Sequence, residues 1–172
     1  MGWYVRTFKR LGRLRWVAAL GPRIVAADRK LQVRTRGRRS LMGRSFNPML
    51  LTTTGRRSGE PRVSPLIYAA VDGGYVVAGT NFGQRHHPAW SGNLLAEPAA
   101  TISIDGRETA VRARLVEDQG PERDRLWAAM TALWPAYDEY AGRAGRPIRL
   151  FLLAPVADEA NGAANGGGPK PT

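Results

Sequence analysis

Hydrophobic and polar positions follow two different patterns along the chain, with a change near residue 45. From Trp3 to about Leu20, apolar side chains recur at helical spacing, and arginines and lysines lie on the opposite face. The apolar stripe consists of Trp3, Tyr4, Phe8, Leu11, Leu14 and Ala18. This pattern predicts a basic amphipathic helix within an N-terminal arm of residues 1–45.

Beyond residue 45 the apolar segments are short, and turn residues separate them. The segments typical of strands are Met49–Thr54, Arg62–Val71, Tyr75–Thr80, Ala100–Ile104, Arg107–Val116 and Ile148–Leu153. Glycine-containing turns at residues 72–74 and 105–106 predict two hairpins, one between the second and third segments and one between the fourth and fifth. Pro65 has no N–H to donate, so the second segment is expected at a sheet edge or a bulge.

Two further segments have helical patterns. Pro88 opens a short helix that closes near Pro98, and Pro121–Leu133 places its larger apolar side chains on an inner face. The element order β-β-β-α-β-β-α-β, without a repeated βαβ unit, predicts an α+β fold that is mainly an antiparallel barrel, and it argues against a Rossmann fold. We expect this barrel domain to cover residues 46–156. Residues 157–172, which are rich in Gly, Ala and Asn, are expected to form a disordered tail.

The net charge of +12 lies in the arm rather than in the barrel. Residues 1–44 contain thirteen Arg and Lys against Asp28 alone, whereas the remaining residues contain thirteen basic and thirteen acidic groups. Such an arm either binds an anionic membrane surface or packs on the domain or on a partner subunit. Without cysteine, a secretory signal or an apolar run that spans a bilayer, the chain is expected in the cytoplasm, with peripheral attachment to the inner face of the plasma membrane as the membrane alternative.

The loop between the first two predicted strands has the composition of an anion-binding site. Gly55 and Gly59 permit tight turns that would aim consecutive backbone N–H groups into one concavity, Thr54 and Ser58 offer hydroxyl groups, and three arginines lie within the same stretch. These arginines are Arg56, Arg57 and Arg62, whose guanidinium groups suit phosphate or carboxylate. A solvated basic turn is the alternative interpretation. The spacing of a P-loop is absent, so the loop does not predict nucleotide hydrolysis.

Histidine chemistry is not predicted. His86 and His87 are adjacent, so in an extended segment their side chains point in opposite directions. Because no cysteine or suitably placed carboxylate accompanies them, we expect no metal site and interpret both as residues of a loop.

Several separated motifs resemble the deazaflavin-dependent nitroreductase family of actinobacteria, also called the nitroreductase/quinone reductase family. The motifs are the run from Leu51 to Arg62, Ser64-Pro65-Leu66, Asp72-Gly73-Gly74, Pro88-Ala89-Trp90, Asn93-Leu94 and the aromatic series Trp134-Pro135-Ala136-Tyr137 with Tyr140. The resemblance covers residues 46–156. It implies a split β-barrel of the FMN-binding type with flanking helices and, as cofactor, coenzyme F-420, an 8-hydroxy-5-deazaflavin with a phosphate and a glutamate tail.

The resemblance also implies roles for individual residues. The phosphate and tail would lie on the loop formed by Thr54, Gly55, Arg56, Arg57, Ser58, Gly59 and Arg62. Residues along the deazaflavin would be Pro65, Ala78, Thr80, Trp90 and Asn93. Substrate contacts would come from Ile67, Trp134, Tyr137 and Tyr140. Trp134 stands where at least one relative has Tyr, and Ile67 stands where an aromatic residue occurs in relatives.

The reaction implied is a hydride transfer from the reduced deazaflavin to a quinone, a nitroaromatic or a similar electrophile. Tyr137, Tyr140 and Thr80 would donate hydrogen bonds to the oxygen that gains charge, which makes them the candidate catalytic residues. One alternative is the same barrel with FMN as cofactor. Another is a nucleic-acid-binding protein that uses the basic arm, against which the neutral charge of the barrel argues. The oligomeric state is not predicted.

Overall fold

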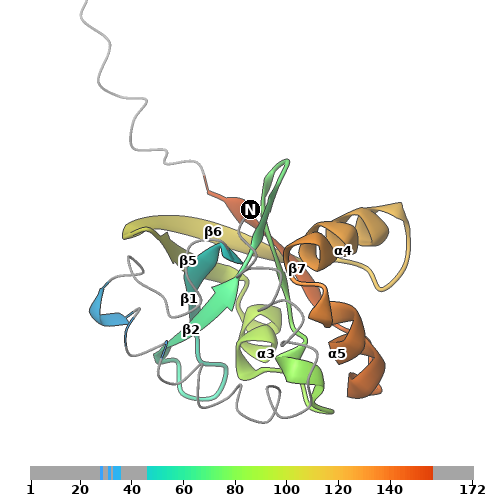
Figure 1. Cartoon of the computed structure of the whole chain (residues 1–172). Coiled ribbons are helices and arrows are strands. Elements are labelled where there is room, and N and C mark those ends of the chain that lie inside the picture. Colours follow the sequence, from blue (N-terminus) through green and yellow to red (C-terminus); the bar gives the residue numbers. More distant parts are fainter. Residues whose placement is uncertain (1–27, 29–30, 32, 36–45, 157–172) are drawn as a thin grey trace, which may run out of the picture.

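The computed structural model describes residues 28, 31, 33–35 and 46–156. The helix predicted for Trp3–Leu20 and the tail predicted for residues 157–172 lie outside the described residues. The strands are β1 (Pro48–Thr54), β2 (Pro61–Ile67), β3 (Ala69–Val71), β4 (Gly74–Ala78), β5 (Ala99–Ile104), β6 (Arg107–Leu115) and β7 (Leu150–Pro155). The helices are the short η2 (Asn81–Gly83), α3 (Ala89–Ala96), α4 (Pro121–Leu133) and α5 (Ala136–Ala144). Figure 1 shows their arrangement.

The seven strands form one antiparallel sheet in the order β2-β1-β5-β6-β7-β4-β3. The two edge strands, β2 and β3, are separated in the sequence by Tyr68 alone. A sheet whose opposite edges are joined by one residue has to curl until those edges meet, and this produces the barrel. Fold class and antiparallel pairing are therefore as predicted.

The predicted strand Arg62–Val71 is wrong in its pairing, because the structure divides it at Tyr68. Pro61–Ile67 pairs with β1, and only Ala69–Val71 forms the predicted hairpin with β4. At the break, the Tyr68 N–H donates to the Asn47 carbonyl at 3.1 Å. The chain thus passes from one sheet edge to the other. Pro65 lies on an edge strand, as predicted.

The helices pack at two different places. The bounds of α4 agree with the prediction, whereas no element was predicted over α5. The helices α4 and α5 contact each other and lie together on one flank of the barrel, where α4 also contacts β3 and β4 (Figure 1). A hydrogen bond from the Trp127 indole N–H to Asp138 Oδ1, 2.8 Å long, joins these two helices. Helix α3 instead packs on β1.

Two hydrophobic cores explain why some strands are apolar on both faces. In β4, Val77 points into the barrel interior with Trp90 and Leu94 of α3, while Val76 points to the core under α4 and α5. In β7, the interior residues alternate in the same way with residues of the outer core. In strand β6, buried Val111 and Ala113 alternate with exposed residues, and Leu115 at the end of the strand is 43% exposed.

Candidate functional site

The loop between β1 and β2 is a tight turn held by its own backbone. The Gly55 N–H donates to the Glu60 carbonyl at 2.8 Å, and the Gly59 N–H donates to the Gly55 carbonyl at 2.7 Å. Gly59 adopts a left-handed conformation with φ of 70°. A Cβ atom at position 55 would lie 2.8 Å from Ser58 Oγ and 3.0 Å from the Glu60 carbonyl oxygen, so a larger residue there would force the turn to shift.

This geometry corrects one expectation about how the loop holds an anion. The turns at the loop glycines were expected to direct backbone N–H groups toward a ligand, but the amides of Gly55, Ser58 and Gly59 donate to carbonyls of the loop itself. The Glu60 amide donates to Ser58 Oγ at 3.3 Å. A turn this short satisfies its own amides. Side chains therefore have to supply most of the donors for an anion.

Arg56 and Asn93 join the loop to helix α3. The Arg56 backbone N–H donates to Asn93 Oδ1 at 3.2 Å, and Asn93 Nδ2 donates to Thr53 Oγ1 at 3.0 Å. Both Thr53 and Asn93 are buried. The Arg56 guanidinium lies on the helix at Gly92, where a Cβ atom would be 3.1 Å from Nη1 and 3.3 Å from Cζ. Thr53 and Gly92 were not predicted as site residues, although a glycine inside a helix can indicate that another group packs closely against the helix backbone.

The three predicted arginines are brought to one side of the molecule, and their charge is not neutralised by the loop. All three are exposed, and Arg62 Nη2 donates to Ser58 Oγ at 3.2 Å. Among the described residues, no carboxylate lies within ion-pair distance of Arg56, Arg57 or Arg62, even though Glu60 belongs to the same loop. Uncompensated guanidinium groups on a rigid turn are suited to bind a phosphate or carboxylate.

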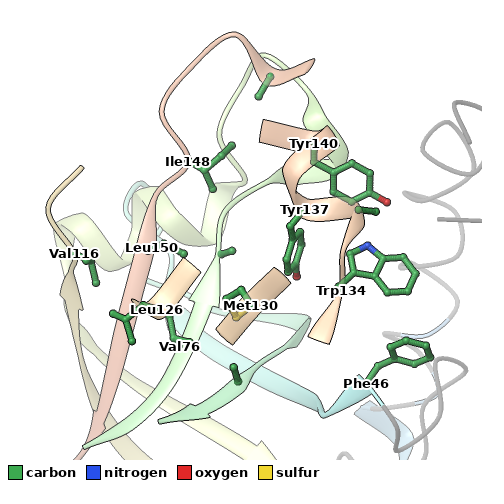
Figure 2. Packing of buried hydrophobic residues seen from close by; sticks show 14 residues of the cluster. Phe46, Val76, Val116, Leu126, Met130, Trp134, Tyr137, Tyr140, Ile148 and Leu150 are labelled. Carbon is green, nitrogen blue, oxygen red and sulfur yellow. The ribbon is translucent and has the colours of Figure 1, made fainter. Parts of the chain in front are cut away.

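The predicted substrate residues lie in a different region, the aromatic cluster. We use this name for Phe46, Phe82, Trp127, Trp134, Tyr137 and Tyr140. Trp134 is 5.3 Å from Phe46 between ring centroids, and Tyr137 is 6.1 Å from Tyr140. Figure 2 shows Phe46, Trp134 and Tyr140 following one another along one side of the core, with Tyr137 beside them. Ile67 and Ala78 pack in the same core.

Burial keeps the tyrosines of this cluster protonated. Burial, and to a lesser extent the neighbouring Tyr140, raises the pKa of the Tyr137 hydroxyl well above its usual value. Burial also raises the pKa of Tyr140, while a side-chain hydrogen bond with Trp134 and the charge of Arg143 act in the opposite direction. The Arg143 guanidinium carbon lies 5.2 Å from the centre of the Tyr140 ring. A phenol with a raised pKa remains a hydrogen-bond donor at neutral pH.

The remaining predicted residues are spread between these two regions. Pro65 is half-buried on β2 opposite Leu50. Thr80 is 4% exposed and immediately precedes the short helix η2. Trp90 is buried in the barrel interior, where its ring packs against Phe151 at a centroid distance of 5.7 Å. Trp90 thus anchors α3 in the core of the barrel, and its place beside the cofactor stays a prediction.

For the described part of the chain, the structure also bears on metal binding, on membrane-spanning helices and on the two histidines. The described residues contain no group of three or more His, Asp and Glu side chains placed to hold a metal ion. None of their helices is both long and apolar enough to cross a bilayer. His86 is exposed and His87 is half-buried in the loop that follows Thr80, which is where sequence reasoning placed them.

Known proteins resemble this chain in sequence and in fold. The family model of the F-420H(2)-dependent quinone reductases matches residues 24–155. A Mycobacterium tuberculosis (strain H37Rv) protein named F-420H(2)-dependent quinone reductase is 31% identical over 106 residues, which are 61% of this chain and 71% of that protein. A solved structure described as an F-420-H2 dependent reductase has a TM-score of 0.57 and 30% identity, and the match covers 62% of this chain and 93% of that one.

A second solved structure, described as a domain-swapped dimer, has a TM-score of 0.59 and 27% identity over 77% of this chain and 98% of its own. The likeness in fold confirms that the barrel is a split β-barrel. The family model spans most of the sequence, including the loop from Thr54 to Arg62 and the aromatic cluster. The chain therefore belongs to the F-420H(2)-dependent quinone reductases, a family of reductases that use coenzyme F-420.

Proposed function

We propose that this F-420-dependent reductase delivers a hydride from reduced F-420 to a quinone, and that nitroaromatic compounds are further acceptors. The observation that carries the proposal is the loop from Thr54 to Arg62, where three guanidinium groups without carboxylate partners among the described residues are fixed on a rigid turn. This loop suits a cofactor with an anionic tail.

The residues of the loop fit the phosphate and glutamate tail of F-420. Arg57 and Arg62 are exposed and would hold the anionic groups through their side chains, with the Ser58 hydroxyl beside them. Arg56 contributes charge while its backbone is tied to Asn93. Gly92 leaves room for the Arg56 guanidinium on the surface of α3. The fit depends mainly on side chains, because most amides of the turn already donate to acceptors within the protein.

When bound, reduced F-420 supplies the hydride, so the protein needs no nucleophile or metal of its own. The protein orients the acceptor and stabilises the negative charge that develops on its oxygen. Tyr137 and Tyr140 suit this task because a phenol hydroxyl is protonated at neutral pH and can donate, and the burial that raises both pKa values does not change this. Thr80 is the third proposed donor, and Ile67 and Trp134 form the apolar surroundings of the acceptor.

Selective loss of tail binding tests this proposal. We would titrate the wild type and the Arg57→Gln/Arg62→Gln double variant with F-420 and with the same deazaflavin lacking phosphate and tail. Each charge-assisted hydrogen bond is worth about 1.5–3 kcal/mol, so the affinity for F-420 should fall at least about tenfold. Affinity for the tailless deazaflavin should be unchanged.

A control variant, Arg107→Gln on the exposed end of β6, should behave as the wild type with both compounds. If the double variant loses both compounds to the same extent, or neither, then the loop does not hold the tail. The same titration with FMN examines the alternative cofactor, since tight FMN binding without F-420 binding would favour the FMN interpretation.

A further inference from the structure

Arg146 connects the segment after α5 to the loop that follows β4. Its side chain reaches four backbone carbonyls and one ring nitrogen of this loop, which we call the Gly79–His87 loop. The contacts are Nη2 to the carbonyls of Gly79 (3.2 Å), Thr80 (3.3 Å) and His86 (3.1 Å), Nε to the carbonyl of Gln84 (3.2 Å) and Nη1 to Nδ1 of His87 (2.9 Å). Both ends of the loop are thereby attached to one guanidinium group.

The guanidinium has no nitrogen left over for a ligand. Its Nη1 also donates to the Pro147 carbonyl at 3.3 Å, so each of the three nitrogens bonds to the protein. A guanidinium offers five N–H groups in a fixed planar arrangement, which suits it to join several carbonyls at once. Arg146 is therefore placed to hold the chain in position rather than to bind an anion.

The Gly79–His87 loop has a backbone that needs such support. Asn81, Phe82 and Gly83 have successive φ values of 48°, 55° and 78°. Left-handed conformations are unfavourable for residues other than glycine and persist where the surroundings impose them. Within the loop itself, the Gly83 amide donates to the Thr80 carbonyl and the Gln84 amide to the Asn81 carbonyl, both at 3.0 Å.

The same loop packs against α5, the helix that carries Tyr137 and Tyr140. A Cβ atom at position 83 would lie 3.1 Å from the Tyr140 carbonyl oxygen and 3.2 Å from its Cα, so loop and α5 are in close contact. The Phe82 ring lies 6.0 Å from the Tyr140 ring. Any displacement of the loop thus changes the position of Thr80 and Phe82 relative to Tyr140.

We propose that Arg146 is a positioning residue for hydride transfer, which fixes the Gly79–His87 loop and so sets Thr80 and Phe82 against Tyr140. The inference rests on the proposed function, in which Thr80 lies beside the cofactor and donates to the acceptor. Arg146 acts through the loop and contacts neither of them. Its loss should lower kcat more than it weakens the binding of cofactor or acceptor, because the chemical groups remain present but are misplaced.

The test compares Arg146→Gln and Arg146→Lys with Arg125→Gln, an exposed arginine of α4, as matched control. In the cofactor-free protein, Arg146→Gln should make hydrogen exchange at the Gly83 and Gln84 amides at least about tenfold faster, without a matching change in β1. In turnover, kcat should fall at least about tenfold while the acceptor KM changes less than about twofold. Arg146→Lys should be intermediate, because an ammonium group cannot reach both ends of the loop.

Unchanged loop exchange together with wild-type kcat in Arg146→Gln would overturn the inference. So would faster exchange throughout the barrel, which would mean general destabilisation. If Arg146→Gln does not fold, the lysine variant decides by the same two measurements. Failure of the wild type to oxidise reduced F-420 would instead count against the proposed function, while the exchange measurement would still decide whether Arg146 holds the loop.

Discussion

The contact between Gly92 and Arg56 allows a single methyl group to test whether Arg56 binds the cofactor. Gly92→Ala adds a methyl group 3.1 Å from Arg56 Nη1, and the flexible guanidinium has to move away. Because the displaced atoms end a long side chain, the barrel should remain stable while the affinity for F-420 falls by about threefold to tenfold, or about 1 kcal/mol. Fluorescence titration gives the affinity, and thermal unfolding gives the stability.

Gly142→Ala is the matched control, because this glycine lies in α5 with nothing within 4 Å of an added Cβ atom. Alanine is favoured over glycine inside a helix by about 1 kcal/mol, so the control should be slightly more stable than the wild type and bind F-420 equally well. Unchanged F-420 affinity in Gly92→Ala would remove Arg56 from the cofactor site.

Tyr137 is the proposed donor with the most strongly raised pKa. Tyr137→Phe removes only the hydroxyl from a buried ring, so the packing of α5 should survive. If the hydroxyl stabilises the developing charge on the acceptor, kcat/KM should fall at least about tenfold. Steady-state oxidation of reduced F-420 at several quinone concentrations measures it. A variant as active as the wild type would leave Tyr137 with a packing role.

At the scale of elements, the Gly79–His87 loop should make stability depend on pH. Burial, together with the charges of Arg146 and Arg149, lowers the pKa of His87 below its usual 6.5, and Asp118 acts in the opposite direction. The unfolded chain therefore takes up a proton at His87 before the folded protein does. The contribution of His87 is complete above about pH 6.5, and stability falls as the pH decreases below it.

Urea unfolding of the wild type and His87→Gln between pH 5 and 8 measures this contribution, with His86→Gln in the same loop as control. The free energy of unfolding of the wild type should fall more steeply below about pH 6.5 than that of His87→Gln. Parallel curves for these two proteins would show that folding does not lower the pKa of His87.

Elements could be predicted where neighbouring residues in the sequence mark their ends and their apolar face. Helix α4 begins at Pro121 and has apolar residues at helical spacing, so its bounds were predictable from a few neighbouring residues. Helix α5 has comparable signals, with Asp138 and Glu139 in its first turn and Gly145 after its end, but this stretch was interpreted only through its aromatic residues. These local features were sufficient to predict a helix over α5.

Other features depend on distant parts of the chain and leave no local signal. The run from Arg62 to Val71 gives no indication that it divides at Tyr68, because the division depends on closure of the whole sheet. Within the site, the arginines of the loop were predictable from their clustering with glycines. Arg146 was not, since its role depends on carbonyls roughly sixty residues away in the sequence.

At the scale of the whole molecule, two basic segments are expected to have separate tasks. The arginines of the loop belong to a neutral barrel, whereas the charge of +12 lies in residues 1–44. We propose that the arm binds anionic lipid. Replacing Arg6, Arg10 and Arg13 by Gln should weaken binding to vesicles that contain phosphatidylglycerol by about 1 kcal/mol per residue. Affinity for F-420 should not change.

Co-sedimentation at increasing salt concentration measures vesicle binding, with phosphatidylcholine vesicles as the neutral reference. A control triple variant at Arg107, Arg112 and Arg125, which are exposed on the barrel domain, should bind as the wild type does. Equal binding of the arm variant and the wild type would mean that the arginines of the arm have another task.

We expect the whole protein to oxidise reduced F-420 with a quinone as the acceptor. The most direct measurement follows the appearance of oxidised F-420 when purified full-length protein is mixed with reduced F-420 and menadione. We expect oxidation that depends on both protein and quinone, and slower oxidation with Arg57→Gln/Arg62→Gln at low cofactor concentration. No protein-dependent oxidation with menadione or other quinones, or equal activity with reduced FMN in place of reduced F-420, would contradict the claim.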